Sequence, residues 1–597
     1  MSLTLQQRSA VECDQNILLT ACPGSGKTRT IIAKLVREVE RYRDTPRAVA
    51  CITYTNTAVQ EIEHRSAALL RSGDELNYVV STIHAFCLNY ILRPFAWKLE
   101  GFAGMPRILS RDNPEFETIV QYASGQVGFY NLRSTDYEAF EGLNIDATGQ
   151  IIGSAERNDM VKRAAPCFWR RCEELGYIDF CNVLYRSYLL LRDHPDVTRS
   201  LASRFAFFLI DEFQDTTDLQ IEILKLIHAQ GKSAFFAVGD LAQSIYAFTG
   251  ARPELVQPFA DHIGARSDMS LSGNYRSNPQ IIGHAEGLFP RNPAMVAAGR
   301  NSACTQQPRL VTGVSSFQAI TEHFLPVLAD MNIPLGEASI LSKMWTTLLP
   351  LSRQLREFGV PVVGPGARPY RRVRLFATLA EQICGAIIDP QPESVYTLER
   401  ALFNAVQDAT GQSRSDVYSF KGRVAIIRML REAKRLADTG AGGAIAWLDA
   451  MATATGETLR WAEFVDAAQA GLFYASVQEM KADMQRNGTD MENLSIEDLG
   501  MFASPSRALR LSTIHNAKGR EYSAVAILGV REGSIPDYRA HTASEIESEK
   551  RLFYVAVTRA KRFLFYVCES DRFGNPPSRF LGAEGVNILG SAMAFAA

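Results

Sequence analysis

One short segment near the N-terminus restricts the possible folds of this chain more than any other. Residues Ile17 to Thr28, ILLTACPGSGKT, join an apolar stretch to a glycine-containing loop and then to a Lys-Thr pair that opens a helical pattern. Gly24 and Gly26 allow the backbone N–H groups of the loop to curl around a phosphate. This order of strand, loop and helix predicts a nucleoside triphosphate site, and a glycine-rich turn without a ligand is the alternative.

The side chains of the same loop fit that prediction. Lys27 would bridge the outer phosphates, and the hydroxyl of Thr28 would hold Mg2+. The usual pattern begins with Gly, where this chain has Ala21. The residues expected to contact the nucleotide here are Ala21, Gly24, Ser25, Gly26, Lys27, Thr28 and Arg29.

A pair of acidic residues supplies the second half of such a site. In LIDEFQD, residues Leu209 to Asp215, an apolar segment ends in Asp211 and Glu212. Asp211 would hold Mg2+ through water, and Glu212 would polarise the attacking water. An Asp-Glu pair alone is often only a solvated loop. Together with the phosphate loop, the pair predicts a nucleotide triphosphatase.

Apolar segments alternate with helical patterns through the first third of the chain. Three of them are typical of short buried strands, and each ends in polar residues before a helix-like stretch. This rhythm predicts an α/β fold in which helices cover both faces of a parallel sheet. The three segments are CITYTN (Cys51 to Asn56), FAFFLIDE (Phe205 to Glu212) and SAFFAVGD (Ser233 to Asp240).

The rest of the chain repeats this organisation. A second alternating region runs from about Arg309 to Gly366 and resumes at Arg510. Residues 88–200 and 371–504 are instead mostly helical in pattern. The sequence therefore predicts two α/β regions, each interrupted by helices.

Composition excludes several classes of protein. No apolar run approaches the ~18 residues of a membrane-spanning helix, and the N-terminal segment lacks the pattern of a secretory signal. The ten cysteines form no disulfide framework, so we expect a cytoplasmic protein with no membrane contact. The 63 basic and 65 acidic residues give a net charge of -2, which excludes a generally cationic coat but permits a local basic cleft for nucleic acid.

Further segments add an aromatic and arginine-rich signature to the phosphate loop and the acidic pair. They are VGDLAQSIYAFTGA (Val238 to Ala251), LSGNYRS (Leu271 to Ser277), LSTIHNAKGREY (Leu511 to Tyr522) and KRLFYVAVTRAKR (Lys550 to Arg562). In this order and spacing, the segments resemble the UvrD/Rep/PcrA group of superfamily 1 helicases. The resemblance extends from Gln7 to about Leu581.

The resemblance implies a fold and a domain plan. It implies two RecA-like parallel-sheet motor domains, each with a mostly helical insertion, and ATP bound in the cleft between the motor domains. The expected ranges are 1–86 and 201–275 for the first motor domain, 87–200 for its insertion, 276–370 and 505–597 for the second motor domain, and 371–504 for its insertion.

The resemblance also implies roles in nucleotide binding and hydrolysis. Arg276 and Arg559 look like the two arginines that reach the terminal phosphate, where an arginine neutralises charge in the transition state. Gln243 resembles the glutamine that senses that phosphate. The remaining counterparts are Gln7 for adenine, Tyr275 for stacking on adenine and Glu521 for the ribose.

On the nucleic-acid side, the matching positions are Tyr54, Thr82, His84, Tyr246, Phe248, Thr513 and His515. A base stacked on an aromatic side chain is worth ~1–3 kcal/mol and tolerates any sequence, which suits a motor that moves along any strand. Packing in a core is the alternative for each aromatic residue. Thr249 stands where the family usually has arginine. The expected coupling between ATP binding or hydrolysis and the affinity for the DNA strand is therefore weaker.

These features predict an ATP- and Mg2+-dependent DNA helicase or translocase that acts on single strands and single/double-strand junctions, with the 3′-to-5′ direction implied by the resemblance. DNA repair or anti-phage defence would be its setting. The alternative is a DNA-sensing regulatory subunit that unwinds little by itself and serves a partner such as a nuclease, with the basic stretch from Lys421 to Arg435 as a docking face. RNA as substrate is a third option, because stacking does not read the 2′-OH.

Overall fold

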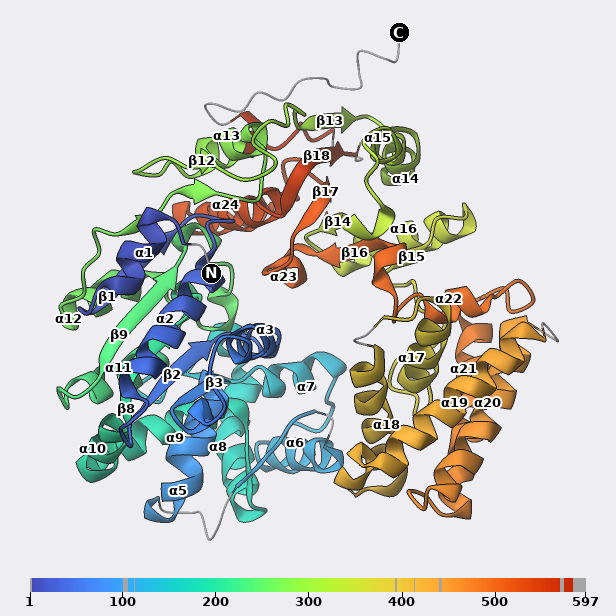
Figure 1. The fold of residues 1–597 in the computed structure, drawn as a ribbon, viewed down its shortest axis with the longest axis horizontal. Helices are drawn as coiled ribbons and strands as arrows, with labels where there is room; N and C mark the ends of the chain where they lie inside the picture. The colour runs from blue at the N-terminus through green and yellow to red at the C-terminus, as the bar shows by residue number, and fades with distance from the viewer. Residues whose placement is uncertain are drawn as a thin grey trace. The chain divides into compact units, whose positions relative to one another are not determined.

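The computed structural model describes residues 3–99, 106–111, 113–391, 394–412, 414–439, 443–569 and 574–582. The chain forms two compact units (Figure 1). The first unit comprises Met1–Thr305 and Ala540–Thr558, and the second comprises Gln306–Arg539 and Arg559–Ala597. The last part of the predicted second motor domain, residues 583–597, lies outside the described residues.

The first unit is built on a six-stranded sheet in the order β10-β1-β9-β8-β2-β3, in which every pair of neighbours is parallel. All residues of β2 and β8 are buried, as a parallel sheet covered on both faces requires. The three segments predicted to be strands all contribute to this sheet. The strands are β1 (Ile17–Ala21), β2 (Ala48–Thr53), β3 (Tyr78–Thr82), β8 (Phe205–Ile210), β9 (Ala234–Gly239) and β10 (Ser270–Leu271).

Helices cover this sheet on both faces because successive residues of its strands point in opposite directions. In β8, Phe207 belongs to a hydrophobic cluster with Ile31 and Leu35 of α2, whereas Phe208 belongs to a second cluster with Leu224 of α11. The helices of this part of the unit are α1 (Leu5–Glu12), α2 (Lys27–Tyr42), α3 (Asn56–Ala67), α4 (Ile83–Cys87), α11 (Asp218–His228), α12 (Val256–His262), α13 (Pro279–Leu288) and α24 (Ala543–Val557).

A mostly helical segment separates β3 from β8. Phe116, Phe140 and Phe168 belong to a hydrophobic cluster within this segment, whereas Leu190 and Leu201 join the cluster of the sheet. A short antiparallel hairpin of β5 (Asn144–Ile145) and β6 (Ile151–Ile152) interrupts the helices. The main helices are α6 (Pro114–Gln126), α7 (Ser134–Glu141), α8 (Asp159–Glu174), α9 (Phe180–Asp193) and α10 (Pro195–Arg204).

The second unit contains another six-stranded parallel sheet, in the order β13-β18-β17-β14-β16-β15. Its core joins residues from the sheet, such as Ile340 and Phe565, to Leu351 of α16 (Trp345–Glu357). The strands are β13 (Arg309–Thr312), β14 (Ala338–Ser342), β15 (Val362–Val363), β16 (Leu509–Thr513), β17 (Tyr522–Leu528) and β18 (Ala560–Cys568).

Helices again interrupt this sheet, between β15 and β16 (Figure 1). They share one hydrophobic cluster that includes Phe376, Trp447 and Met480. The α/β class, with two parallel-sheet regions that each carry a helical insertion, is thus confirmed. The helices are α17 (Ala377–Ile388), α18 (Ser394–Thr410), α19 (Phe420–Asp438), α20 (Gly443–Trp461), α21 (Ala467–Arg486) and α22 (Ile496–Gly500).

The connection between β17 and β18 leaves the second unit and returns to it. Helix α24 follows β17 and precedes β18, which are neighbours in the second sheet, yet α24 belongs to the first unit. The boundaries of the four predicted domains remain a prediction. Within the described residues, no helix combines the length and apolarity needed to cross a membrane.

Candidate active site

The phosphate loop lies between the end of β1 at Ala21 and the start of α2 at Lys27. Gly24 and Gly26 have φ angles of 69° and 82°, in the left-handed region that favours glycine. Since Gly26 precedes α2 and has no side chain, the first N–H groups of that helix receive no side-chain cap from it. They are the donors that bind an anion at a helix N-terminus.

Close neighbours also require both glycines. A Cβ on Gly24 would lie 2.5 Å from the Cβ of Arg276, and a Cβ on Gly26 would lie 2.7 Å from Nε2 of Gln7. The side chain of Ser25 donates to the carbonyl of Cys22 at 2.7 Å and so closes the loop on itself. The loop is therefore fixed from both sides by residues that the sequence places far apart.

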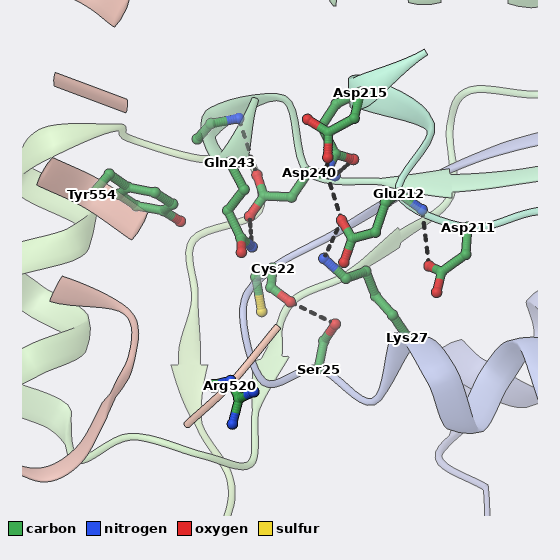
Figure 2. A network of polar contacts seen from close by, with 12 residues as sticks. Cys22, Ser25, Lys27, Asp211, Glu212, Asp215, Asp240, Gln243, Arg520 and Tyr554 are labelled. Carbon is green, nitrogen blue, oxygen red and sulfur yellow. Dashed lines mark hydrogen bonds and ion pairs between the residues drawn. The ribbon is translucent and has the colours of Figure 1, made fainter. Parts of the chain in front are cut away.

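The acidic pair lies at the end of β8, opposite the loop lysine. Lys27 Nζ is 3.6 Å from Oε2 of Glu212, and Figure 2 shows the two side chains pointing toward each other. Glu212 has a φ of 51°, a conformation that costs free energy in a residue other than glycine and that often marks functional sites. Its backbone N–H donates to Oδ1 of Asp211 at 2.9 Å.

The carboxyl group of Asp211 is almost fully buried. Burial raises its pKa to about 7, the carboxylate of Glu212 acts in the same direction, and the Lys27 ammonium partly offsets both. A buried carboxylate beside a second one favours a bound cation. With the hydroxyl of Thr28 in the first turn of α2, these hard oxygen donors fit Mg2+.

Two polar residues that were not predicted from the sequence join the ends of β8 and β9. Asp240 donates its backbone N–H to Oε1 of Gln214 at 2.9 Å, and Gln214 Nε2 donates to Oε2 of Glu212. Asp240 Oδ2 in turn accepts from Nε2 of Gln243 at 2.6 Å. Gln243 and Glu212 therefore belong to one network. In the sequence, Gln214 and Asp240 could have been found only as polar residues that come soon after the buried strands β8 and β9.

Gln7 contacts the phosphate loop from α1. Its Nε2 donates to the carbonyl of Ser25 at 2.9 Å, and its Oε1 accepts from the N–H of Thr4 at 3.1 Å. The exposed fraction of Gln7 is only 2%. Its amide is therefore held in one orientation beside the loop that precedes α2.

Tyr275 and Arg276 also lie against this loop. The N–H of Tyr275 donates to the carbonyl of Gly24 at 2.9 Å, and 42% of Tyr275 is exposed. The guanidinium of Arg276 donates to the carbonyl of Thr558, at the end of α24, at 3.0 Å. The first unit thus brings together most residues predicted to contact the nucleotide, namely Gln7, Gly24, Lys27, Asp211, Glu212, Gln243, Tyr275 and Arg276.

Two predicted nucleotide contacts, Arg559 and Glu521, belong to the second unit. Arg559 is 2% exposed, and its NH1 donates to the carbonyl of Arg520 at 3.2 Å. Glu521 forms an ion pair with Lys561 at 2.8 Å. Arg559 and Glu521 immediately precede the neighbouring strands β18 and β17, so the structure brings these two residues together.

An aromatic cluster lies beside the acidic pair. The rings of Tyr54 and Tyr246 stack with centroids 5.0 Å apart, and the Phe248 ring lies 6.1 Å from that of Tyr246. Phe248 is 55% exposed, whereas the two tyrosines are half-buried. A cavity of about 30 Å3 is lined by Tyr54 on one side and by Asp211 and Glu212 among others. One candidate strand contact, Tyr54, therefore lines the same cavity as the candidate catalytic acids.

The loop that carries these aromatics is also held by the first insertion. Tyr54 and Thr249 face each other, with their hydroxyl oxygens 3.5 Å apart. The side chain of Asn144, in the β5–β6 hairpin, donates to the carbonyl of Thr249 at 3.0 Å. Thr249 thus links the aromatic cluster to the hairpin at the position where the family usually has arginine.

The four remaining candidate strand contacts occur in a repeated tetrapeptide, Ser-Thr-Ile-His, at 81–84 and 512–515. Thr82 and Thr513 each end a strand and cap a short helix, with φ, ψ angles of -74°, 158° and -74°, 155°. Burial lowers the pKa of His84 to about 4. Burial and the ammonium groups of Lys343 and Lys518 lower that of His515. Both imidazoles are thus uncharged at neutral pH.

Comparison with known proteins follows the same division of the chain. A family model described as the UvrD/REP helicase N-terminal domain matches residues 3–263, and one described as the UvrD-like helicase C-terminal domain matches residues 469–570. The chain is 24% identical to a putative ATP-dependent DNA helicase, YjcD, of Bacillus subtilis, covering 96% of this chain and 80% of that protein.

Two further relatives have similar coverage. The ATP-dependent DNA helicase Rep of Salmonella typhimurium is 25% identical over 97% of this chain and 94% of its own length. The ATP-dependent DNA helicase PcrA of Leuconostoc citreum is 23% identical over 98% of this chain and 85% of its own length.

Proposed function

Because this chain belongs to the UvrD-like superfamily 1 helicases, we propose that it is an ATP-dependent DNA helicase or translocase that moves along single-stranded DNA in the 3′-to-5′ direction. The main structural support for the proposal is the placement of Lys27 opposite Glu212 at the phosphate loop. Lys27 faces Glu212 at 3.6 Å, at a loop whose two glycines are required by their neighbours. The relatives are named as ATP-dependent DNA helicases, which supports DNA as the partner.

In the proposed reaction, the loop N–H groups and Lys27 bind the phosphates of ATP, and Glu212 accepts a proton from the attacking water. Gln214 orients the carboxylate of Glu212 through its hydrogen bond. Arg276 and Arg559 neutralise charge at the terminal phosphate. Thr28 and Asp211 would hold Mg2+, which supplies charge neutralisation at the phosphates when bound.

The proposed strand contacts are the aromatic cluster and the two Ser-Thr-Ile-His segments. Phe248, as the exposed ring of its cluster, is placed to stack on an unpaired base. The uncharged His84 and His515 would contact the strand by hydrogen bonds rather than as cations. The direction of movement comes from the family alone.

The first test is ATP hydrolysis by the purified chain, with and without single-stranded DNA, across a salt series. We expect stimulation by DNA that fades as salt rises, since cations released from the strand drive binding. Lys27→Ala and Glu212→Gln should abolish turnover while single-strand binding stays detectable. Normal turnover in Glu212→Gln would contradict the proposed active site.

A strand-displacement assay with tailed duplexes then separates unwinding from translocation. Displacement from a 3′ tail and not from a 5′ tail is the expected result. Stimulated hydrolysis without displacement would instead support a regulatory subunit that needs a partner such as a nuclease. Equal stimulation by RNA and DNA strands would remove DNA preference from the proposal.

A further inference from the structure

The carboxylate of Asp240 is the centre of a buried polar network that the proposed reaction does not yet explain. Its side chain is 1% exposed. Oδ2 accepts from Nε2 of Gln243 at 2.6 Å, and Oδ1 accepts from the N–H of Ala242 at 3.1 Å and from the guanidinium of Arg291. Hydrogen bonds to a charged group are stronger and more directional than neutral ones. The orientation of Asp240 therefore depends on Arg291.

Arg291 links this carboxylate to α24. Its guanidinium also donates to the hydroxyl of Tyr554 at 2.9 Å. Tyr554 is fully buried, and its ring packs edge-on against Phe289 with centroids 5.4 Å apart. The backbone N–H of Arg291 donates to the carboxylate of Glu286 at 3.0 Å, which fixes the loop after α13. Both Arg291 and the tyrosine ring are thus held independently of their mutual hydrogen bond.

The network reaches two of the groups proposed to act at the terminal phosphate, Gln243 and Glu212. Through its side chain Asp240 holds Gln243, and through its N–H it holds Gln214, which donates to Glu212. Figure 2 shows Asp240 between Gln243 and the Glu212 side of the site. A displacement of Asp240 would therefore misplace both Gln243 and Glu212.

We infer that Arg291 and Tyr554 are positioning residues for ATP hydrolysis, which fix Asp240 and thereby aim Gln243 and Glu212 at the reacting phosphate. The inference rests on the proposed function. It makes α24 part of the hydrolytic site at two points, because Thr558 at its end also accepts from Arg276 at 3.0 Å.

The test uses the full chain with Tyr554→Phe, which removes the hydroxyl and keeps the ring against Phe289. We expect kcat of DNA-stimulated ATP hydrolysis to fall about tenfold, with KM for ATP changed less than about twofold, because positioning acts on the transition state rather than on substrate binding. Tyr566→Phe is the matched control, since Tyr566 is equally buried but lies on β18. It should keep the parent kcat, and both variants should remain folded at the assay temperature.

A double-mutant cycle distinguishes a positioning role from a purely structural one, because a general loss of stability would not make the kcat losses of Tyr554→Phe and Gln243→Ala depend on each other. Because part of the effect of Tyr554 passes through Gln243, Tyr554→Phe should reduce kcat about tenfold in the parent but by a smaller factor in a Gln243→Ala background, where only the path through Gln214 to Glu212 remains. Arg291→Lys keeps the charge but cannot donate to Asp240 and Tyr554 at the same time with the geometry of a guanidinium. Its effect on kcat should likewise be smaller in the Gln243→Ala background than in the parent.

Three outcomes would overturn the inference. The first is a parent-like kcat in Tyr554→Phe. The second is a loss of kcat that is fully explained by a lowered melting temperature. The third is a kcat loss in the double variant that equals the product of the losses in the two single variants. The proposed function fails separately. If the parent chain hydrolyses ATP and Glu212→Gln does not, a parent-like result for Tyr554→Phe refutes the positioning role alone. If the parent shows no hydrolysis under any condition, both are refuted.

Discussion

At the scale of single residues, the phosphate loop is the most sharply constrained part of the chain. Gly26 combines a φ of 82° with a Cβ position 2.7 Å from Nε2 of Gln7. Both the backbone conformation and the close approach exclude a side chain. Gln7 is itself anchored to the loop carbonyl of Ser25, so any displacement of Gln7 also disturbs the loop.

We therefore predict that Gly26→Ala weakens nucleotide binding by at least about tenfold and lowers stability by about 1–3 kcal/mol, the usual cost of a left-handed residue other than glycine. Fluorescent nucleotide titration and thermal unfolding measure the two effects. Gly471→Ala is the control, since Gly471 lies in α21, where an added Cβ would have no neighbour within 4 Å. It should be neutral or slightly stabilising. Unchanged nucleotide affinity in Gly26→Ala would contradict this account of the loop.

Phe248 is the residue-scale test of strand contact. Its ring is 55% exposed beside the stacked pair of Tyr54 and Tyr246. We predict that Phe248→Ala weakens single-stranded DNA binding by ~1–3 kcal/mol and lowers DNA-stimulated hydrolysis, while hydrolysis without DNA stays the same. Fluorescence anisotropy with a labelled oligonucleotide measures the affinity. Phe358→Ala, at another exposed phenylalanine, should bind like the parent. Equal affinity of both variants would disprove the stacking role.

Among the helices and strands, the second insertion is held together by arginine–carboxylate contacts that join the start of α17 to α21. Arg374, just before α17, donates to both carboxylate oxygens of Asp483 in α21, at 2.8 and 3.0 Å. Arg486 donates to the same carboxylate at 2.6 Å. These contacts lower the pKa of Asp483 to about 2, so the carboxylate is stabilised as an anion.

We predict that Asp483→Asn destabilises the chain at neutral pH by about 1–3 kcal/mol, because Arg374 loses its charged acceptor. The pKa of Asp483 is depressed from 3.8 to about 2. The stabilisation is therefore complete above pH 4 and is lost as the pH falls toward 2. Thermal unfolding of parent and variant from pH 7 to pH 2.5 should show a difference that narrows with acid. A difference independent of pH would contradict this assignment.

At the scale of the whole molecule, the helical insertion of the second unit has a hydrophobic core separate from that of the sheet. Its first and last helices, α17 and α22, pack so closely that a Cβ on Gly500 would lie 3.0 Å from the backbone of Gly385. The chain therefore enters and leaves the insertion at neighbouring positions. An insertion built in this way is separable from the sheet that carries it.

We predict that replacing residues 377–500 by a short Gly-Ser linker leaves a folded protein whose DNA-stimulated ATP hydrolysis stays within about fivefold of the parent, since the removed core is its own. Circular dichroism and the hydrolysis assay measure both properties, and Glu212→Gln in the shortened chain is the negative control. Loss of folding would show that the second sheet depends on the insertion.

The local parts of this protein follow directly from its amino-acid sequence. It predicted the phosphate loop, the acidic pair after β8, the buried strands and the helical insertions. The loop, the acidic pair and each strand are encoded within about a dozen neighbouring residues, through the φ freedom of Gly24 and Gly26 or the unbroken apolar run of a covered parallel strand. The insertions follow from longer helical patterns, at residues 88–200 and 371–504. The family resemblance added the roles of distant residues such as Arg276 and Gln243, and those roles remain proposals.

The distant groups that meet at the site are recognised only from the folded chain. The contact of Arg291 with Asp240 and Tyr554 joins segments separated by 51 and 263 positions, and no local pattern marks any of the three as partners. The same holds for the placement of α24 in the first unit although its flanking strands belong to the second. Such contacts depend on how two sheets and their connections pack, and packing is a property of the whole chain rather than of any segment of it.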